Sequence, residues 1–341
     1  NRAAQNAARD IDAAQKQKWE TTATGLPQIS AKVDYQNFLK QQVSLIPAQF
    51  FGGNEGEFAE VVFGTKQNVN AFATLDQLLF DGSYLVGLQS AKVFLEISKN
   101  AKEKTDLEVR KMVINAYGNV LLSEESVKIT KNNKVVLQKN LEETTKIYEN
   151  GLTEEENVEQ LQITLLQVDN NLKNAERLRD IAYKMLNITL GANLNNQVVL
   201  KDNLQSLADQ NIRLDLLEAK EDVENTIDYK IAANDARSKE LLLKLEKSKA
   251  LPRLNAFING GYTGNNDTFD FLNSDQQWFG SSLVGVSLNV PIFSSLGRSA
   301  STQRARINLE KAKTDLTETE QQLKFQIASA KSNYQFAIES Y

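Results

Sequence analysis

The sequence predicts a mainly helical fold into which two β-hairpins are inserted. Two segments with period-two alternation begin with Leu-Pro, at Leu26-Pro27 and at Leu251-Pro252. Each is followed by a second alternating segment, which ends at Leu79-Phe80 or at Ile292-Phe293, and then by a long stretch of helical composition. The same order of elements twice in one chain indicates an internal duplication.

Composition excludes several classes of function. The chain has 341 residues and a formal net charge of −5, and it contains neither Cys nor His. A mildly acidic chain has no basic surface typical of nucleic-acid binding. The lack of Cys and His excludes disulfides, Cys/His zinc sites and imidazole-based triads. No run reaches the ~20 apolar residues of a membrane-spanning helix.

The duplication suggests two structural repeats. Residues 1–213 form the first, with a helix, a β-hairpin at about 26–80, a long helical hairpin at about 85–190 and a polar linker at 191–213. Residues 214–341 form the second, with a helix to about Lys249, a β-hairpin at about 251–293 and a long helix still continuing at Tyr341. We interpret the sequence as a fragment whose ends lie within helices.

The long helical hairpin is predicted from two apolar seams. Residues 85–150 lack Pro and as a helix would be roughly 100 Å long. Alternating steps of four and three along it visit Val109, Val113, Ala116, Val120, Ser123, Val127, Thr130, Lys134, Leu137, Leu141, Thr144 and Tyr148. The return helix carries a matching seam at Val158, Leu161, Leu165, Val168, Leu172, Ala175, Arg179, Ala182, Leu186 and Thr189. Between them Gly151 ends one helix, and Thr153 is expected to cap the next, with acidic residues in its first turn.

Each predicted hairpin has an apolar face and a polar face. The polar faces carry Lys32, Asp34, Asp76, Asn255 and Asn289. A half-buried sheet in a soluble protein is the usual cause of such alternation, but no amphipathic element remains to cover the apolar face. An open sheet cannot lie in lipid, because its edge N–H and C=O groups would be unpaired. Several chains contributing strands to one closed barrel would solve this, and three chains would give 12 strands.

The sequence resembles the TolC family of outer-membrane efflux channels over essentially its whole length. The resemblance is carried by motifs in a fixed order: Leu26-Pro27 with Tyr35; Leu78-Leu79-Phe80-Asp81-Gly82; Asn150-Gly151-Leu152-Thr153; Leu251-Pro252 with Gly260-Gly261-Tyr262; and Val286 to Phe293 followed by Gly297-Arg298. It implies a homotrimer in which four strands per chain build a 12-stranded β-barrel. That barrel would continue into an α-helical barrel, with short helices stacked end to end to match the long ones.

The resemblance also implies a location and a function. The protein would lie in the outer membrane of a Gram-negative bacterium, with a periplasmic extension. It would be the passive export duct of a tripartite efflux or type I secretion system, carrying small toxic molecules or secreted proteins. Its partners would be a periplasmic adaptor protein and an inner-membrane transporter, either a proton-driven pump or an ABC exporter.

Three sets of residues are candidates for function. The tip residues Asn150, Gly151, Leu152 and Thr153 would contact the adaptor. Three Glu follow this tip, whereas the better-known family pattern has a small residue and Asp there. The tip would also be an ordinary helix end, whether or not it contacts an adaptor. The polar residues Lys32, Asp34, Asp76, Asn255 and Asn289 would line the lumen, either selectively or simply by being solvated. Phe80, Gly82, Pro291, Phe293 and Gly297 would make the transitions from strand to helix.

The remaining features give weaker expectations. The Phe-rich stretch 50–63 and Trp278-Phe279 would form an aromatic girdle or an extracellular plug. No nucleophile elbow, phosphate loop or metal-ligand spacing is present, so we expect neither an enzyme nor a cofactor. The alternative is a soluble, non-enzymatic coiled-coil scaffold whose β-hairpins pack on each other.

Overall fold

The computed structural model describes residues 1–220 and 222–340. By their contacts these residues fall into two compact units. The helical unit comprises residues 1–14, 95–220, 222–236 and 312–340, and the sheet unit comprises residues 15–94 and 237–311. Each unit draws segments from both predicted repeats, and the duplication itself stays a prediction.

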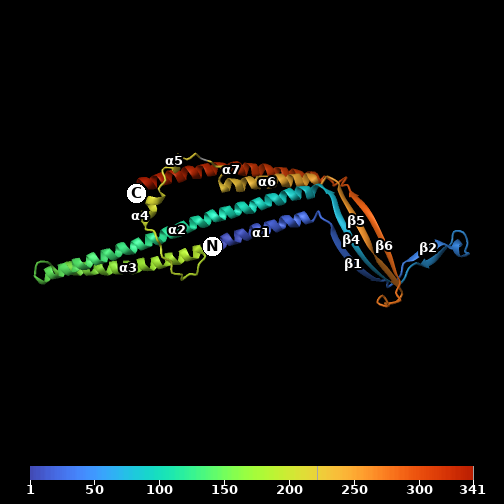
Figure 1. Cartoon of the computed structure of the whole chain (residues 1–341), viewed down its shortest axis with the longest axis horizontal. Helices are drawn as coiled ribbons and strands as arrows, with labels where there is room; N and C mark the ends of the chain where they lie inside the picture. The colour runs from blue at the N-terminus through green and yellow to red at the C-terminus, as the bar shows by residue number, and fades with distance from the viewer. Residues whose placement is uncertain (221, 341) are drawn as a thin grey trace. The chain divides into compact units, whose positions relative to one another are not determined.

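Helices and strands alternate in blocks along the chain (Figure 1). In chain order they are α1 (Arg2–Ala23), β1 (Gln28–Asn37), β2 (Val43–Pro47), the short 3-10 helix η1 (Ala48–Phe51), β3 (Phe58–Val62), β4 (Gln67–Asp81), α2 (Gly82–Glu149), α3 (Glu155–Leu190), α4 (Leu204–Asn211), α5 (Asp215–Glu218), α6 (Ile227–Ser248), β5 (Arg253–Asn266), β6 (Trp278–Asn289) and α7 (Gly297–Ser340). The expectation that the last helix continues at Tyr341 concerns a residue outside the described part of the chain.

The helical unit contains the predicted helical hairpin. α3 runs back along the second half of α2 (Figure 1). Every residue of the two predicted seams is buried or half-buried except Tyr148. A small core forms where Ala116 and Val120 of α2 meet Leu186 of α3. The period of the apolar residues therefore predicted correctly which sides of the two helices meet.

One side chain connects α1 to the end of α3. The Asn1 amide donates a 2.7 Å hydrogen bond to the Thr189 carbonyl, and its oxygen accepts from the backbone N–H groups of Ala3 and Ala4. Asn1 thus caps the first turn of α1 while it bonds to the last turn of α3. This is the end-to-end arrangement of short helices that the family resemblance implied.

The sheet unit is built around one four-stranded antiparallel sheet in the order β1-β4-β5-β6. The two predicted hairpins, β1–β4 and β5–β6, are joined through the pairing of β4 with β5. No described strand pairs with the outer side of β1 or β6, so both edges of the sheet are open.

Glycines of the sheet lie opposite aromatic residues. The register pairs Phe72 with Gly261, Phe257 with Gly285, Tyr262 with Gly280 and Trp278 with Gly264. In each pair a Cβ added to the glycine would come within 3.3 Å of the aromatic ring. Rings that cover cross-strand glycines are a device for holding register in twisted, curved sheets.

The structure adds strands to the Phe-rich stretch, for which the sequence predicted none. Residues 38–66 contain a second antiparallel hairpin, in which β2 pairs with β3 from Val43–Val62 to Pro47–Phe58, with η1 at its turn. This hairpin extends beyond the end of the main sheet (Figure 1). Its strands are short, and the Gly- and Phe-rich turn between them concealed their alternation.

Two predicted element boundaries were also wrong. The strand expected to reach Ile292 ends at Asn289, because Pro291 has no N–H to continue the ladder. The helix expected from about Leu214 to Lys249 is replaced by the single turn of α5 and by α6, which begins only at Ile227; residue 221 of that expected helix lies outside the described residues. The Thr226 hydroxyl accepts from the N–H of Tyr229, so Thr226 starts α6 as its N-cap.

Candidate functional site

The five predicted lumen residues lie on one face of the sheet. The register pairs Asp34 with Asn70, Asp76 with Phe257 and Asn255 with Ser287. Directly paired residues share a face, and alternate residues of a strand share it too. Lys32 and Asn289 therefore lie on the same face as the other three. We call this the polar face. Its polar residues are Gln28, Ser30, Lys32, Asp34, Gln36, Asn68, Asn70, Thr74, Asp76, Arg253, Asn255, Asn259, Thr263, Asn265, Ser281, Ser287 and Asn289, and the same register also places Phe72, Leu78, Phe257, Phe279 and Leu283 on it.

Hydrogen bonds tie β4 to β5 across the polar face. Asn259 donates to the Thr74 hydroxyl at 2.7 Å, and the Thr263 hydroxyl donates to the Asn70 amide oxygen at 2.8 Å. Farther along, Asn68 donates to the Asn265 amide oxygen at 2.9 Å. These residues were absent from the prediction, although their alternation along both strands was visible in the sequence.

The charges on the polar face are few. Lys32 pairs with Asp34 two residues away at 2.9 Å, so these two charges largely neutralise each other. Arg253 lies 3.7 Å from Asp81 at the start of α2. The middle of the polar face carries uncharged amides and hydroxyls, which are readily solvated, together with the apolar side chains of Phe72, Phe257 and Leu283.

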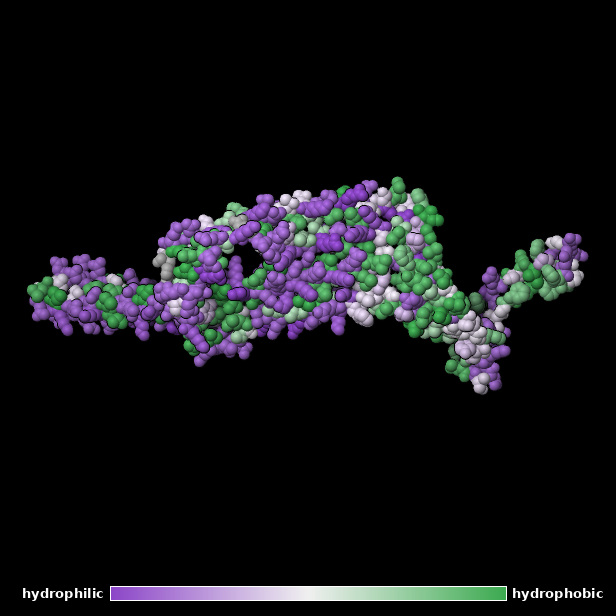
Figure 2. Space-filling model, turned by 45° about the horizontal axis from the view of Figure 1, so that its top comes forward, coloured by the Kyte–Doolittle hydropathy of each residue, from purple (hydrophilic) through white to green (hydrophobic). Residues whose placement is uncertain are grey.

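The opposite face is apolar and uncovered. It comprises Ile29, Ala31, Val33, Val69, Ala71, Ala73, Leu75, Leu254, Ala256, Ile258, Tyr262, Val284, Val286 and Leu288. Most of its large side chains are exposed, with Ile29 and Val284 at 76% and 77%, whereas Val69, Leu75 and Leu254 are half-buried. Figure 2 shows much green over the sheet, whereas purple covers most of the helical surface. So large an exposed apolar surface marks contact with another protein or with lipid.

The tip of the helical hairpin is a tight turn. Gly151 adopts φ 71°, and its N–H bonds to Tyr148 O at 2.8 Å while the N–H of Leu152 bonds to Ile147 O at 3.0 Å. This pair of bonds is the Schellman motif that ends many helices. It leaves Leu152 with 78% of its surface exposed.

The predicted N-cap at the tip was wrong by one position. Glu154 is the N-cap residue of α3, and its side chain makes no capping hydrogen bond. The Thr153 hydroxyl accepts instead from the side-chain amide of Asn157 at 3.0 Å. Glu155 and Glu156 lie in the first turn of α3, where their negative charges interact favourably with the positive end of the helix dipole.

The two strand-to-helix transitions differ. At the first, β4 leads directly into α2: Phe80 is the penultimate strand residue, and the Asp81 carboxylate caps the helix that Gly82 begins, accepting from Ser83 N at 2.7 Å. At the second, residues 290–296 separate β6 from α7. Pro291 and Phe293 lie in this segment, and Gly297 begins α7. The Arg298 guanidinium holds the segment by donating to Pro291 O at 2.7 Å and to Ile292 O at 3.1 Å.

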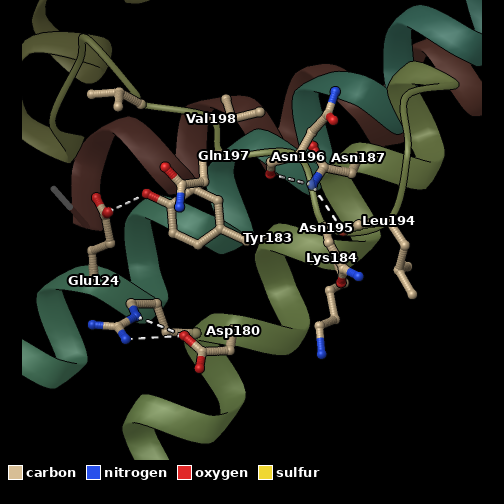
Figure 3. A pocket seen from close by; sticks show the side chains of 12 residues that line it. Glu124, Asp180, Tyr183, Lys184, Asn187, Leu194, Asn195, Asn196, Gln197 and Val198 are labelled. Carbon is tan, nitrogen blue, oxygen red and sulfur yellow. Dashed lines mark hydrogen bonds and ion pairs between the residues drawn. The ribbon is translucent and has the colours of Figure 1, made fainter.

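The linker after α3 is fastened to the helical hairpin by a buried amide. Asn187, only 1% exposed, donates to the carbonyl oxygens of Leu194 and Asn196 at 3.0 and 2.8 Å (Figure 3). Its own amide oxygen has no hydrogen-bond partner in the described part of the chain. A cavity of about 580 Å³ opens beside it, lined by Glu124, by α3 from Arg179 to Asn187 and by residues 194–199.

Two tyrosines support the same linker region. The Tyr183 hydroxyl donates to the Glu124 carboxylate (Figure 3), and burial together with this carboxylate raises the pKa of Tyr183 to about 12. The Tyr117 hydroxyl donates to Asp202 at 2.7 Å, and this bond raises the Tyr117 pKa. Both tyrosines stay protonated as hydrogen-bond donors at neutral pH, so these groups serve structure rather than acid–base chemistry.

An aromatic cluster forms at the loop end of the sheet. Tyr35 packs edge-on against Phe269 and Phe271, with ring centroids 5.5 and 6.2 Å apart, and Phe271 also contacts Trp278. Trp278 therefore packs against a residue of the β5–β6 loop, and the expected aromatic girdle or plug stays a prediction. Phe50, Phe51, Phe58 and Phe63 are exposed.

The described residues contain neither a metal-binding cluster nor a membrane-spanning helix. Among residues 1–220 and 222–340, no group of three or more Asp and Glu side chains is arranged to hold a metal ion. None of the described helices combines the length and apolar composition that crossing a membrane requires.

Comparison with known proteins identifies the family. Residues 1–192 match the model of the outer membrane efflux protein family. The chain belongs to this family. None of the curated protein sequences compared with it matches.

Solved structures of outer-membrane channels share the fold. The chain matches CusC with a TM-score of 0.72 and 15% identity, over 97% of this chain and 71% of CusC. It matches the Campylobacter jejuni outer membrane channel CmeC with a TM-score of 0.64 and 15% identity, over 94% of this chain and 65% of CmeC. It matches the Vibrio cholerae outer membrane protein VceC with a TM-score of 0.69 and 14% identity, over 98% of this chain and 76% of VceC. The chain thus spans only part of the length of each.

Family membership confirms the predicted resemblance and fold class. The chain has the fold of outer-membrane efflux channels, in which a helical barrel joins a β-barrel, and its place is the outer membrane with a periplasmic extension. Channels of this family are trimers that work with efflux partners, and they are not enzymes. The sequence did not reveal the roles of Asn187 and of the glycine–aromatic pairs, because both depend on tertiary contacts.

Proposed function

We propose that the full-length protein is the passive export duct of a tripartite efflux or type I secretion system. Three chains would close their sheets into a 12-stranded barrel, with β6 of one chain beside β1 of the next. The observation that carries this proposal is the four-stranded sheet with two open edges, one exposed apolar face and one polar face. Closure pairs the edges, the apolar face meets lipid, and the polar face surrounds water.

The scaffold alternative receives no support from this sheet. Its hairpins would have to pack face to face to bury their apolar sides. They instead join edge to edge through β4 and β5, which leaves the apolar face uncovered.

In the proposed duct, Lys32, Asp34, Asp76, Asn255 and Asn289 line the lumen. Their common face supports this role, and the scarcity of unpaired charge on it favours a wet, weakly selective wall. Energy for transport would come from an inner-membrane transporter.

The tip residues Asn150, Gly151, Leu152 and Thr153 are proposed to contact a periplasmic adaptor. The exposed Leu152, held outward by the rigid Schellman turn, supports this role. A photo-crosslinker at Leu152 should capture the adaptor in cells. The same crosslinker at Ile188, which is 57% exposed at the other end of α3, is the matched control, and equal capture at both positions would contradict the assignment.

Single-channel conductance of the full-length protein in a planar bilayer tests the duct itself. Stepwise, ohmic openings from a detergent-extracted trimer are the expected result. A protein that stays soluble without detergent and opens no pore would contradict it. Deletion strains then separate the two systems: sensitivity to toxic small molecules indicates drug efflux, and loss of an exported protein indicates secretion.

A further inference from the structure

A pocket of about 300 Å³ lies where the polar face meets the β2–β3 hairpin. The row Gln36, Asn68 and Asn265, paired directly across β1, β4 and β5, forms one wall. The segments that lead into and out of the hairpin, residues 38–42 and 63–65, supply the rest. One chain therefore builds the whole pocket, at the lower end of the volumes that bind small ligands.

The lining of this pocket has an unusual composition. Five of the nine residues carry primary amides, two are Phe, one is Thr, and one is Gly. None of these described lining residues is charged. Such a site offers nothing to neutralise a phosphate, a carboxylate or an ammonium group, so an ionic ligand is disfavoured.

Two of the amides are free to bind a ligand. The side-chain amides of Asn68 and Gln41 already make hydrogen bonds: Asn68 donates to the Asn265 amide oxygen, and Gln41 donates to Gly64 O at 3.1 Å. Gln36 and Gln42 are exposed, and within residues 1–220 and 222–340 neither side chain has a hydrogen-bond partner. Each can therefore offer two donors and one acceptor to the same ligand.

We propose that this pocket binds a neutral saccharide. Sugar hydroxyls both donate and accept, which matches the mixed donors and acceptors of carboxamides. The rings of Phe38 and Phe63 line the same pocket, and they can cover the apolar C–H face of a sugar ring.

Two sources could present this chemistry. A glycan of the cell surface would reach the pocket from the loop side, whereas a glycosylated exported solute would arrive through the lumen. The position of the pocket at a channel mouth rests on the proposed function, but saccharide binding by the chain does not.

Binding is tested on the full-length protein in a detergent without a sugar headgroup, with maltotriose as the probe. Saturation-transfer NMR and calorimetry should detect binding to the wild type. The double variant Gln36→Leu, Gln42→Leu should bind about tenfold more weakly or worse, as expected when hydrogen bonds to both amides are lost. Gln49→Leu removes an exposed amide of η1 that does not line the pocket, and it should bind like the wild type.

Phe63→Ala supplies a second variant that leaves all five amides in place, and it should also weaken binding. Its trimer must first run as wild type on unheated gels. No binding by the wild type, or equal binding by the pocket variants and Gln49→Leu, would overturn the proposal.

Conductance distinguishes the two sources. Current block by maltotriose added only on the loop side indicates a surface glycan, and block from either side indicates an exported solute; polyethylene glycol of similar size controls for simple occlusion. Absence of any conductance would refute the proposed function while leaving the binding result standing.

Discussion

Phe72 and Gly261 are directly paired across β4 and β5, and the phenyl ring occupies the space where a side chain on residue 261 would begin. A Cβ there would lie 2.7 Å from the ring carbon Cδ1 and 2.1 Å from the carbonyl oxygen of Ala71. Movement of the ring would relieve only the first of these contacts. The second involves the backbone, so β4 and β5 can approach each other here only with glycine.

We therefore predict that Gly261→Ala disrupts the sheet. The folded, heat-modifiable trimer in membranes should fall several-fold, because the strands must separate or the register must shift. Gly260→Ala is the matched control, since its added Cβ would lie 3.8 Å from Ser282 Cβ in ordinary contact. Equal trimer yields for the two variants would contradict this account of the pairing.

Neighbouring residues of β6 should respond oppositely to the same charge. Val286 is on the apolar face, 65% exposed, and Ser287 is on the polar face opposite Asn255. Val286→Arg should cost about 2–4 kcal/mol if it lies near the bilayer midplane and should reduce the membrane-inserted trimer. Ser287→Arg should insert normally and shift ion selectivity toward anions, as measured by reversal potential in a salt gradient. Normal insertion of both variants would argue against lipid on the apolar face.

Two glycines of the helical hairpin should give stability changes of opposite sign. Gly151→Ala forces a left-handed backbone on alanine and should destabilise by roughly 1 kcal/mol. Gly118 lies within α2 with open space around its Cα, so Gly118→Ala should stabilise by about 0.5–1 kcal/mol. Thermal unfolding followed by circular dichroism checks both, and shifts of the same sign would be inconsistent with the Schellman turn.

The Tyr183–Glu124 hydrogen bond predicts a response to alkaline pH. The folded pKa of Tyr183 is about 12, above its ordinary value of 10.0, so folding favours the protonated phenol. Its contribution to stability is complete below about pH 10 and is lost as the pH rises through about 12. Tyr183→Phe should remove a late-titrating phenolate from the absorbance titration. Glu124→Gln should lower the pKa of Tyr183 only partly, because burial remains; an unchanged titration in both variants would exclude this assignment.

The sequence was sufficient wherever a short-range pattern decides the structure. Period two sorted Lys32, Asp34 and Asp76 onto one face of the sheet before any register was known, and steps of three and four identified the sides on which α2 and α3 meet. Both patterns follow from backbone geometry alone.

The sequence was insufficient where a tertiary contact or a single side chain determines the local structure. The composition of residues 214–249 is compatible with one continuous helix, but α6 begins only at Ile227, after its N-cap Thr226. Asn187 looks like any solvent-facing amide until the linker folds back over it. The pairing of β2 with β3 likewise depended on a hairpin whose turn disguised its strands.

The open edges of β1 and β6 have a consequence for how the channel is made. A lone chain in hydrocarbon would carry two rows of unpaired N–H and C=O groups, each group costing several kcal/mol. Closing the ring and entering the membrane must therefore be a single event that requires all protomers. The yield of inserted protein should then rise more steeply than linearly with the concentration of unassembled chains, and a single chain should remain outside the bilayer.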